Sequence, residues 1–178
     1  MDVFFLSMIC CLSSFFIISA LTKLSSLRHF ITLNVNVDYI PTKYRSFFLT
    51  LLPFLELSGA LLLVNRQTFF LGWILVTVLL LIFFFHTIVI VLSRKSAACG
   101  CYGKYIKSRI DRFTLLKTSF LLFLSGLILP LVLLEDTFLA FTPASLIMGF
   151  SLTLILLVSQ IAWTSHQETM MLIKKEKN

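Results

Sequence analysis

The stretch FFLGWILVTVLLLIFFFHTIVIVL, residues 69–92, decides the fold of this chain. It contains no Asp, Glu, Lys or Arg. It is also longer than the roughly 20 residues that a helix needs to cross the hydrocarbon core of a bilayer. Because a backbone in lipid must satisfy its hydrogen bonds within the segment, such a run predicts a transmembrane helix.

The rest of the chain has the same character. Of its 178 residues, 58% are hydrophobic, only 13% are charged, and 19 are phenylalanine. A soluble domain of this size could not bury so much apolar surface. We therefore predict an all-α integral membrane protein with a single domain over residues 1–178. The apolar runs predict a bundle of about five transmembrane helices, a four-helix core plus one, with a polar tail at 167–178. The expected spans are residues 3–22, 47–64, 69–92, 115–134 and 142–163.

The charges predict an orientation in the plasma membrane. The formal net charge is +7, but the basic residues are scattered over several loops without exposed aromatics between them, so we expect no nucleic-acid partner. With five spans, most basic residues fall on one side of the membrane: Lys23 and the other cations of 23–46, those of 94–117, and the lysines of the tail. The other side has only Arg66. Since cytoplasmic loops carry the excess of Lys and Arg, we expect the N-terminus outside and the C-terminus in the cytoplasm.

Two thiols one residue apart lie in the most basic loop. The segment Cys99-Gly100-Cys101-Tyr102-Gly103 is flanked by lysines and an arginine, and neighbouring cations stabilise a thiolate. A disulfide across one intervening residue closes a small, strained ring that is easily reduced, which suits exchange chemistry. The alternative is a pair of unpaired loop cysteines. The loop offers two thiols and no histidine, so we predict no metal site.

Four further residues inside the expected spans carry polar or thiol chemistry. Glu56 lies deep in the second span, where an acid must face a bundle interior or a polar path. His86 in the third span is either a packing residue or part of that path. Cys10 and Cys11 in the first span are either small hydrophobes or a second redox station. A polar track could join the loop, His86 and Glu56 to these thiols, depending on how the helices are rotated.

Three motifs resemble the MauE family, the methylamine-utilisation membrane proteins grouped with DoxX as redox-associated membrane proteins. Ala20 to Leu24 is similar to its small-residue-then-Lys-Leu signature, which contains Lys23. Leu52 to Glu56 is similar to its Pro-x-x-Glu, and Cys99 to Gly103 to its Cys-x-Cys-Phe-Gly. The resemblance spans about residues 3–165. It departs at Tyr102, which replaces phenylalanine, and at Lys117-Thr118, where the family often has Arg-Asn.

The resemblance implies a part in forming or processing disulfides of exported proteins, with a thioredoxin-like partner. In this first hypothesis the chain is a thiol–disulfide oxidoreductase in which Cys99 and Cys101 exchange, and a quinone is one candidate electron acceptor. Glu56, His86 and Lys23 would handle protons or tune the thiols. The second hypothesis is a non-catalytic membrane assembly factor with structural cysteines. A third, a solute transporter, is disfavoured because the spans show no broken inverted repeats. Nothing in the sequence indicates that methylamine is involved in the function of this protein.

Overall fold

The computed structural model describes residues 2–33, 42–92, 98–99, 108–109, 112–133 and 142–176. Five long helices dominate it: α1 (Asp2–Ser25), α3 (Thr42–Val64), α4 (Phe69–Leu92), α5 (Arg112–Leu133) and α6 (Pro143–Glu176). Each is long and apolar enough to cross a membrane. The sequence prediction of an all-α membrane protein with five spans is therefore confirmed.

Four of these helices form a closed ring. Contacts run from α1 to α3, from α3 to α4, from α4 to α5, and back from α5 to α1. The fifth long helix, α6, packs on α1 and also reaches α5. This arrangement is the four-helix core plus one that the apolar runs predict.

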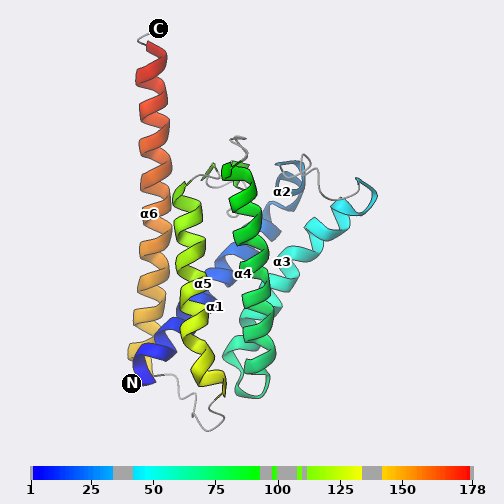
Figure 1. The fold of residues 1–178 in the computed structure, drawn as a ribbon, viewed down its shortest axis with the longest axis vertical. Coiled ribbons are helices and arrows are strands. Elements are labelled where there is room, and N and C mark those ends of the chain that lie inside the picture. The colour runs from blue at the N-terminus through cyan, green and yellow to red at the C-terminus, as the bar shows by residue number, and fades with distance from the viewer. Residues whose placement is uncertain are drawn as a thin grey trace.

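Helix α1 is the centre of the bundle, which it crosses obliquely (Figure 1). In its membrane span, 67% of the residues are buried, against 22–39% for the other spans. Its buried side chains include Ile9, Leu12 and Phe16, which form one cluster with Leu80 of α4 and Leu121 of α5. The other helices leave many large apolar side chains exposed, where they can contact lipid.

A tight hairpin joins α3 to α4, as the sequence predicts for residues 65–68. It is built on the short 3-10 helix η1 (Arg66–Thr68), which Asn65 caps by accepting a hydrogen bond from the Gln67 backbone N at 3.1 Å. Gly72 then lets α4 touch α3 directly, because a Cβ atom there would lie 2.5 Å from the backbone N of Leu63. Helices α3 and α4 are thus held as a closely packed antiparallel pair.

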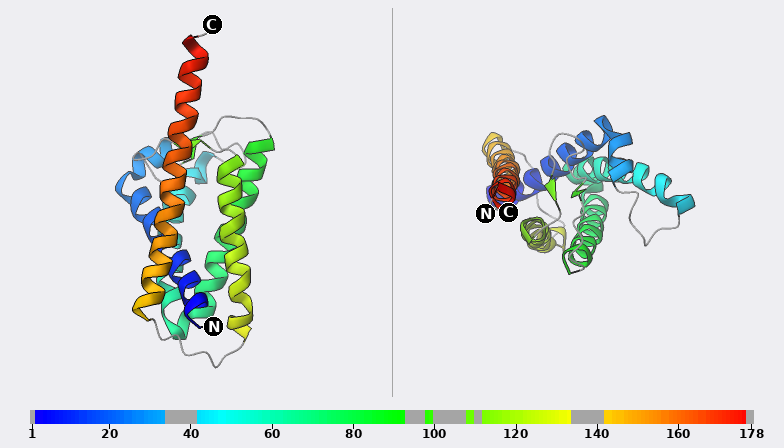
Figure 2. Two further views of the ribbon diagram at one scale, coloured as in Figure 1. Left: turned by 90° about the vertical axis from the view of Figure 1, so that its left-hand side faces the viewer. Right: turned by 90° about the horizontal axis from the view of Figure 1, so that it is seen from above.

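Several boundaries differ from those expected. Helix α1 continues through Lys23, which was expected in the joint after the first span, and the short helix α2 (Leu27–Leu33) follows it. Helix α6 continues to Glu176, so most of the expected polar tail is helical and extends beyond the rest of the bundle (Figure 2). At 1.5 Å per residue, a helix of 34 residues is roughly 50 Å long, well beyond the hydrocarbon core.

A two-residue strand pair closes the loop between α4 and α5. Strand β1 (Ala98–Cys99) pairs antiparallel with β2 (Ser108–Arg109), with Cys99 opposite Ser108. Strand β2 also contacts α6. Because the chain alternates in direction, this loop lies at the end of the bundle where α1 and α4 end and α5 begins (Figure 1).

Candidate functional site

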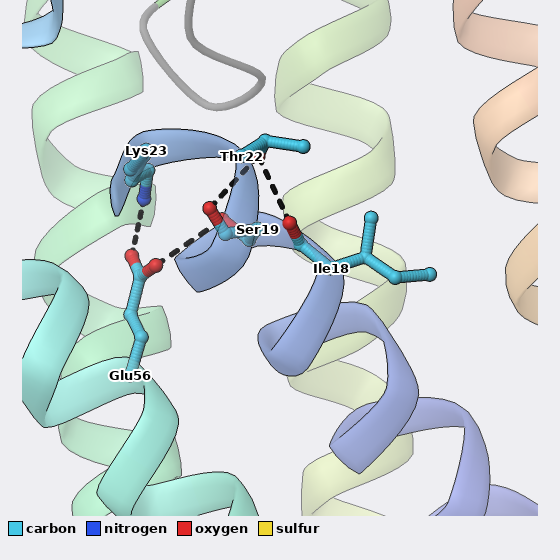
Figure 3. A network of polar contacts seen from close by, with 5 residues as sticks. All are labelled: Ile18, Ser19, Thr22, Lys23 and Glu56. Atoms are coloured by element: carbon cyan, nitrogen blue, oxygen red, sulfur yellow. Dashed lines mark hydrogen bonds and ion pairs between the residues drawn. The ribbon is translucent and has the colours of Figure 1, made fainter. Parts of the chain in front are cut away.

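A buried ion pair joins the first two long helices. The Lys23 ammonium of α1 donates to Oε1 of Glu56 on α3, and Ser19 donates to Oε2 of the same carboxylate at 3.2 Å (Figure 3). Lys23 is 1% exposed and Glu56 is 0% exposed. The residues of two motifs that carry the family resemblance, far apart in sequence, therefore meet in one interaction.

Aromatic rings cover the Lys23 ammonium. The centroid of the Phe83 ring on α4 lies 4.9 Å from Nζ, and that of Phe30 on α2 lies 5.6 Å away. Rings at these distances attract a cation and exclude water from it. The site is thus built by α1, α2, α3 and α4 together, and its opposite charges are held where solvent screens them little.

The end of α1 explains how Phe30 reaches the site. Thr22 donates back to the carbonyl oxygens of Ile18 and Ser19, at 2.9 Å each (Figure 3). Ser26 donates to the Thr22 carbonyl at 2.8 Å. Hydroxyl groups that bond to the preceding turn compete with the regular helical pattern and favour a bend. The chain turns at Ser26 and starts α2, which brings Phe30 over Lys23.

His86 lies one turn beyond Phe83 on α4 and is partly buried. The hydrogen bonds described for Lys23 and Glu56 do not include it. Its expected role in a polar path stays a prediction.

Cys10 and Cys11 are free thiols buried between α1 and α6. At Gly149 of α6, a Cβ atom would lie 2.4 Å from the Cβ of Cys10, and Thr153 donates to the Cys11 carbonyl at 3.2 Å. Along α1, Cys11 is roughly 18 Å from Lys23. The hydrogen bonds described above for Glu56 do not include these thiols, and the expected polar track stays a prediction.

The cysteine pair of the loop is described only in part. The backbone of Cys99 belongs to β1, and Cys101 lies outside the described residues. Within the residues that the structure covers, no group of three or more His, Cys, Asp or Glu side chains could hold a metal ion.

Sequence reasoning missed a second polar contact inside the bundle. Lys117 of α5 donates to Oε1 of Gln160 on α6 at 3.0 Å, and both side chains are buried. Lys117 was counted among the loop cations because it lies close to the start of its span. A lysine followed by the apolar run SFLLFLSGLILP was the signal that could have identified it, since charges inside a span need partners.

Five helices that are long and apolar enough to cross a membrane define this chain as a multi-pass membrane protein. Its sequence matches the family model described as Methylamine utilisation protein MauE over residues 1–133, and the chain belongs to that family. The match ends with α5 and so covers the four-helix ring, while α6 lies outside it. No curated protein and no solved structure matches the chain.

Proposed function

We propose that this MauE-family protein is a membrane thiol–disulfide redox factor that supports disulfide formation in exported proteins. Cys99 and Cys101 are the exchanging pair. A disulfide between them would oxidise a dithiol of a target, so that one S–S bond forms in the target as the loop disulfide is reduced. That target would be the dithiol form of a thioredoxin-like protein, which passes its new disulfide on to the exported protein. The loop dithiol returns to its disulfide by giving two electrons and two protons to an oxidant dissolved in the membrane.

One observation carries the proposal: the loop that contains both thiols is closed at its base by backbone pairing. Cys99 stands opposite Ser108, so the two ends of the segment that contains Cys101 lie side by side. These paired ends lie at the same end of the four-helix ring as the Lys23–Glu56 pair (Figure 1). A segment whose ends are paired in this way can present two neighbouring thiols to a partner while β2 stays in contact with α6.

The Lys23–Glu56 pair serves this function as a positioning element. It ties together the ends of α1 and α3, and its aromatic cover adds α2 and α4. Breaking a buried pair is costly, so the helix ends below the loop stay in one arrangement.

The alternative is a non-catalytic assembly factor. It is favoured by the placement of Cys10 and Cys11, which pack against Gly149 and Thr153 as small core residues would. If the loop cysteines had the same structural character, the protein would hold a partner without exchanging thiols.

Trapping a mixed disulfide separates these functions. In a Cys101→Ser variant, no second loop thiol can attack a mixed disulfide formed between Cys99 and a partner. The mixed disulfide should therefore accumulate, and a reductant should release the partner. The reciprocal Cys99→Ser variant tests which thiol attacks first. A Cys10→Ala/Cys11→Ala variant is the matched control and should behave as wild type. If neither single variant traps a partner and Cys99→Ser/Cys101→Ser stays fully active, the assembly-factor alternative is correct.

A further inference from the structure

A second site lies between the family core and α6. Lys117 on α5 and Gln160 on α6 are 6% and 0% exposed, and the Lys117 ammonium donates to Gln160 Oε1 at 3.0 Å. The contact uses one end of the Gln160 amide. Its other end, the Nε2 group, has no hydrogen-bond partner among the described residues.

A buried amide donor without an acceptor is unusual and calls for an explanation. Exchanging the amide oxygen and nitrogen would not remove the problem, because the N–H group would then face the Lys117 ammonium. The contact with Lys117 therefore fixes the orientation of the amide. Because an unsatisfied buried donor is costly, this end of the amide is suited to an acceptor supplied by a water molecule or a ligand.

The surroundings of the amide favour a flat ligand. The Phe15 ring of α1 lies 5.6 Å from Lys117 Nζ, measured to its centroid. One turn nearer the end of the span, Phe113 and Trp163 stack with their ring centroids 5.5 Å apart and an interplanar angle of 17°. Helices α5 and α6 thus meet through aromatic rings and one polar pair, which together suit an aromatic head group with a carbonyl oxygen.

Gln160 lies within the apolar part of α6. The polar C-terminal part of this helix begins at Thr164, so at 1.5 Å per residue Gln160 lies roughly 6 Å inside the end of the apolar run. A neutral carbonyl compound that dissolves in the hydrocarbon core can reach a site at this depth from the membrane.

We propose that the Lys117–Gln160 site binds the head group of a membrane quinone. The Gln160 amide donates to a quinone carbonyl oxygen, and the adjacent Lys117 charge stabilises the electron density that this oxygen gains on reduction. Since Gln160 is on α6, the site combines the matched family core with a helix outside the match.

The role of the quinone, though not its binding, rests on the proposed thiol function. The Cys99 and Cys101 thiols give up two electrons and two protons and form one S–S bond. The quinone takes up both electrons and both protons and leaves as the hydroquinone. The quinone would then regenerate the loop disulfide that a target consumes.

Fluorescence of Trp163 offers a direct binding assay. The chain has two tryptophans, so Trp73→Phe leaves Trp163 as the reporter next to the site. The full-length protein in phosphatidylcholine nanodiscs is titrated with decylubiquinone, whose ring quenches tryptophan fluorescence. We expect saturable quenching. Gln160→Glu keeps an acceptor for Lys117 but removes the donor, and should raise the Kd about tenfold, the effect of one lost hydrogen bond.

Ser159→Ala is the matched control, because the Ser159 hydroxyl bonds within its own helix to the Leu156 carbonyl. It should leave the Kd unchanged. The melting temperature of the Gln160→Glu variant should be at least as high as that of the parent, because the variant no longer has an unsatisfied buried donor. Gln160→Leu also lacks the donor and should raise the Kd for the quinone as well. In the unmodified chain, an azido-quinone should crosslink to α5 or α6.

Quenching that rises linearly and equally in all variants, or a crosslink elsewhere, would overturn the proposal. If phosphatidylglycerol binding depends on Gln160 and quinone binding does not, the site takes a lipid head group and the proposal is wrong. Binding should persist in Cys99→Ser/Cys101→Ser. The experiments can therefore refute the quinone site without refuting the thiol function, and the reverse.

Discussion

The Lys23 ammonium and the Glu56 carboxylate form an ion pair that no solvent reaches, between two helices that the sequence separates by a long polar joint. Burying two charges is unfavourable unless each stabilises the other. The pair therefore makes the packing of α1 against α3 depend on both residues at once. It gives a physical reason for an acid and a lysine in the apolar interior.

Removing one member of this pair should destabilise the fold strongly. Glu56→Leu or Lys23→Met should each cost about 3–5 kcal/mol, because an uncompensated buried charge remains. Glu56→Gln keeps hydrogen-bonding capacity but not the charge, so it should fall between Glu56→Leu and wild type. Thermal unfolding in detergent micelles measures these effects. Ser58→Ala, which removes a hydroxyl bonded within α3, is the control and should change stability by less than about 0.5 kcal/mol.

The double variant Lys23→Met/Glu56→Leu distinguishes a structural from a functional pair. With both charges replaced by apolar groups, stability should return close to wild type. Trapping of the partner by Cys99 should recover with it if the pair only positions the helix ends. Recovery of stability without recovery of trapping would show that the charges take part in the thiol chemistry, contrary to a positioning role.

Cys10 and Cys11 should be inert in the folded protein. Both thiols are buried, and Gly149 packs against the Cβ of Cys10. In membranes of the Cys99→Ser/Cys101→Ser variant, a mass-shifting maleimide should add to neither thiol until the protein is unfolded in dodecyl sulfate. Labelling of native protein at a rate similar to that of a loop cysteine would contradict the packing and support a second redox station.

The sequence predicts the helices well because hydropathy and length decide which segments enter a bilayer. The number of spans and the 65–68 hairpin follow from those runs, whereas the order in which the helices contact one another in the ring does not. The rotation of each helix is not visible in such a pattern. Sequence reasoning therefore identified Glu56 as needing a partner but placed Lys23, which supplies it, in a loop.

The Lys117–Gln160 contact was not predicted for the same reason, because a hydropathy pattern does not show which residues of two helices face each other. Lys117 lies close to the start of its span, where a lysine side chain can reach the interface. The apolar run after it indicates a lysine inside the span but does not show which residue its side chain contacts. Its burial depends on where α6 packs. The length of α6 was also underestimated, since polar residues from 164 onward end a membrane span without ending a helix.

Gly149 should be essential for the packing of α6 on α1. An added Cβ would lie 2.4 Å from Cys10 Cβ and 2.7 Å from the Ser7 carbonyl oxygen, so Gly149→Ala must push the helices apart. We expect a loss of about 1–3 kcal/mol. Gly126→Ala on α5 is the matched control, because nothing lies within 4 Å of its added Cβ, and it should be neutral or stabilising by up to about 1 kcal/mol. Equal melting temperatures for the two variants would contradict the close contact.

Orientation can be measured at two exposed positions on opposite ends of the bundle. Gln67 lies in η1, at the end of the bundle where the N-terminus lies (Figure 1). Ser165 is exposed and lies in the C-terminal part of α6, toward the opposite end. In a background without the four native cysteines, Gln67→Cys should react with a membrane-impermeant maleimide in intact cells. Ser165→Cys should react only after permeabilisation, because Lys and Arg are concentrated at its end of the chain.

The opposite labelling pattern would reverse the orientation and move the Cys99–Cys101 loop to the outer face. With the predicted orientation the loop meets cytoplasmic partners, and an exported target could reach it only before translocation is complete. With the reversed orientation, the loop would face the compartment where disulfides persist. The same two labelled positions thus decide which compartment supplies the partner that the mixed-disulfide experiment would trap.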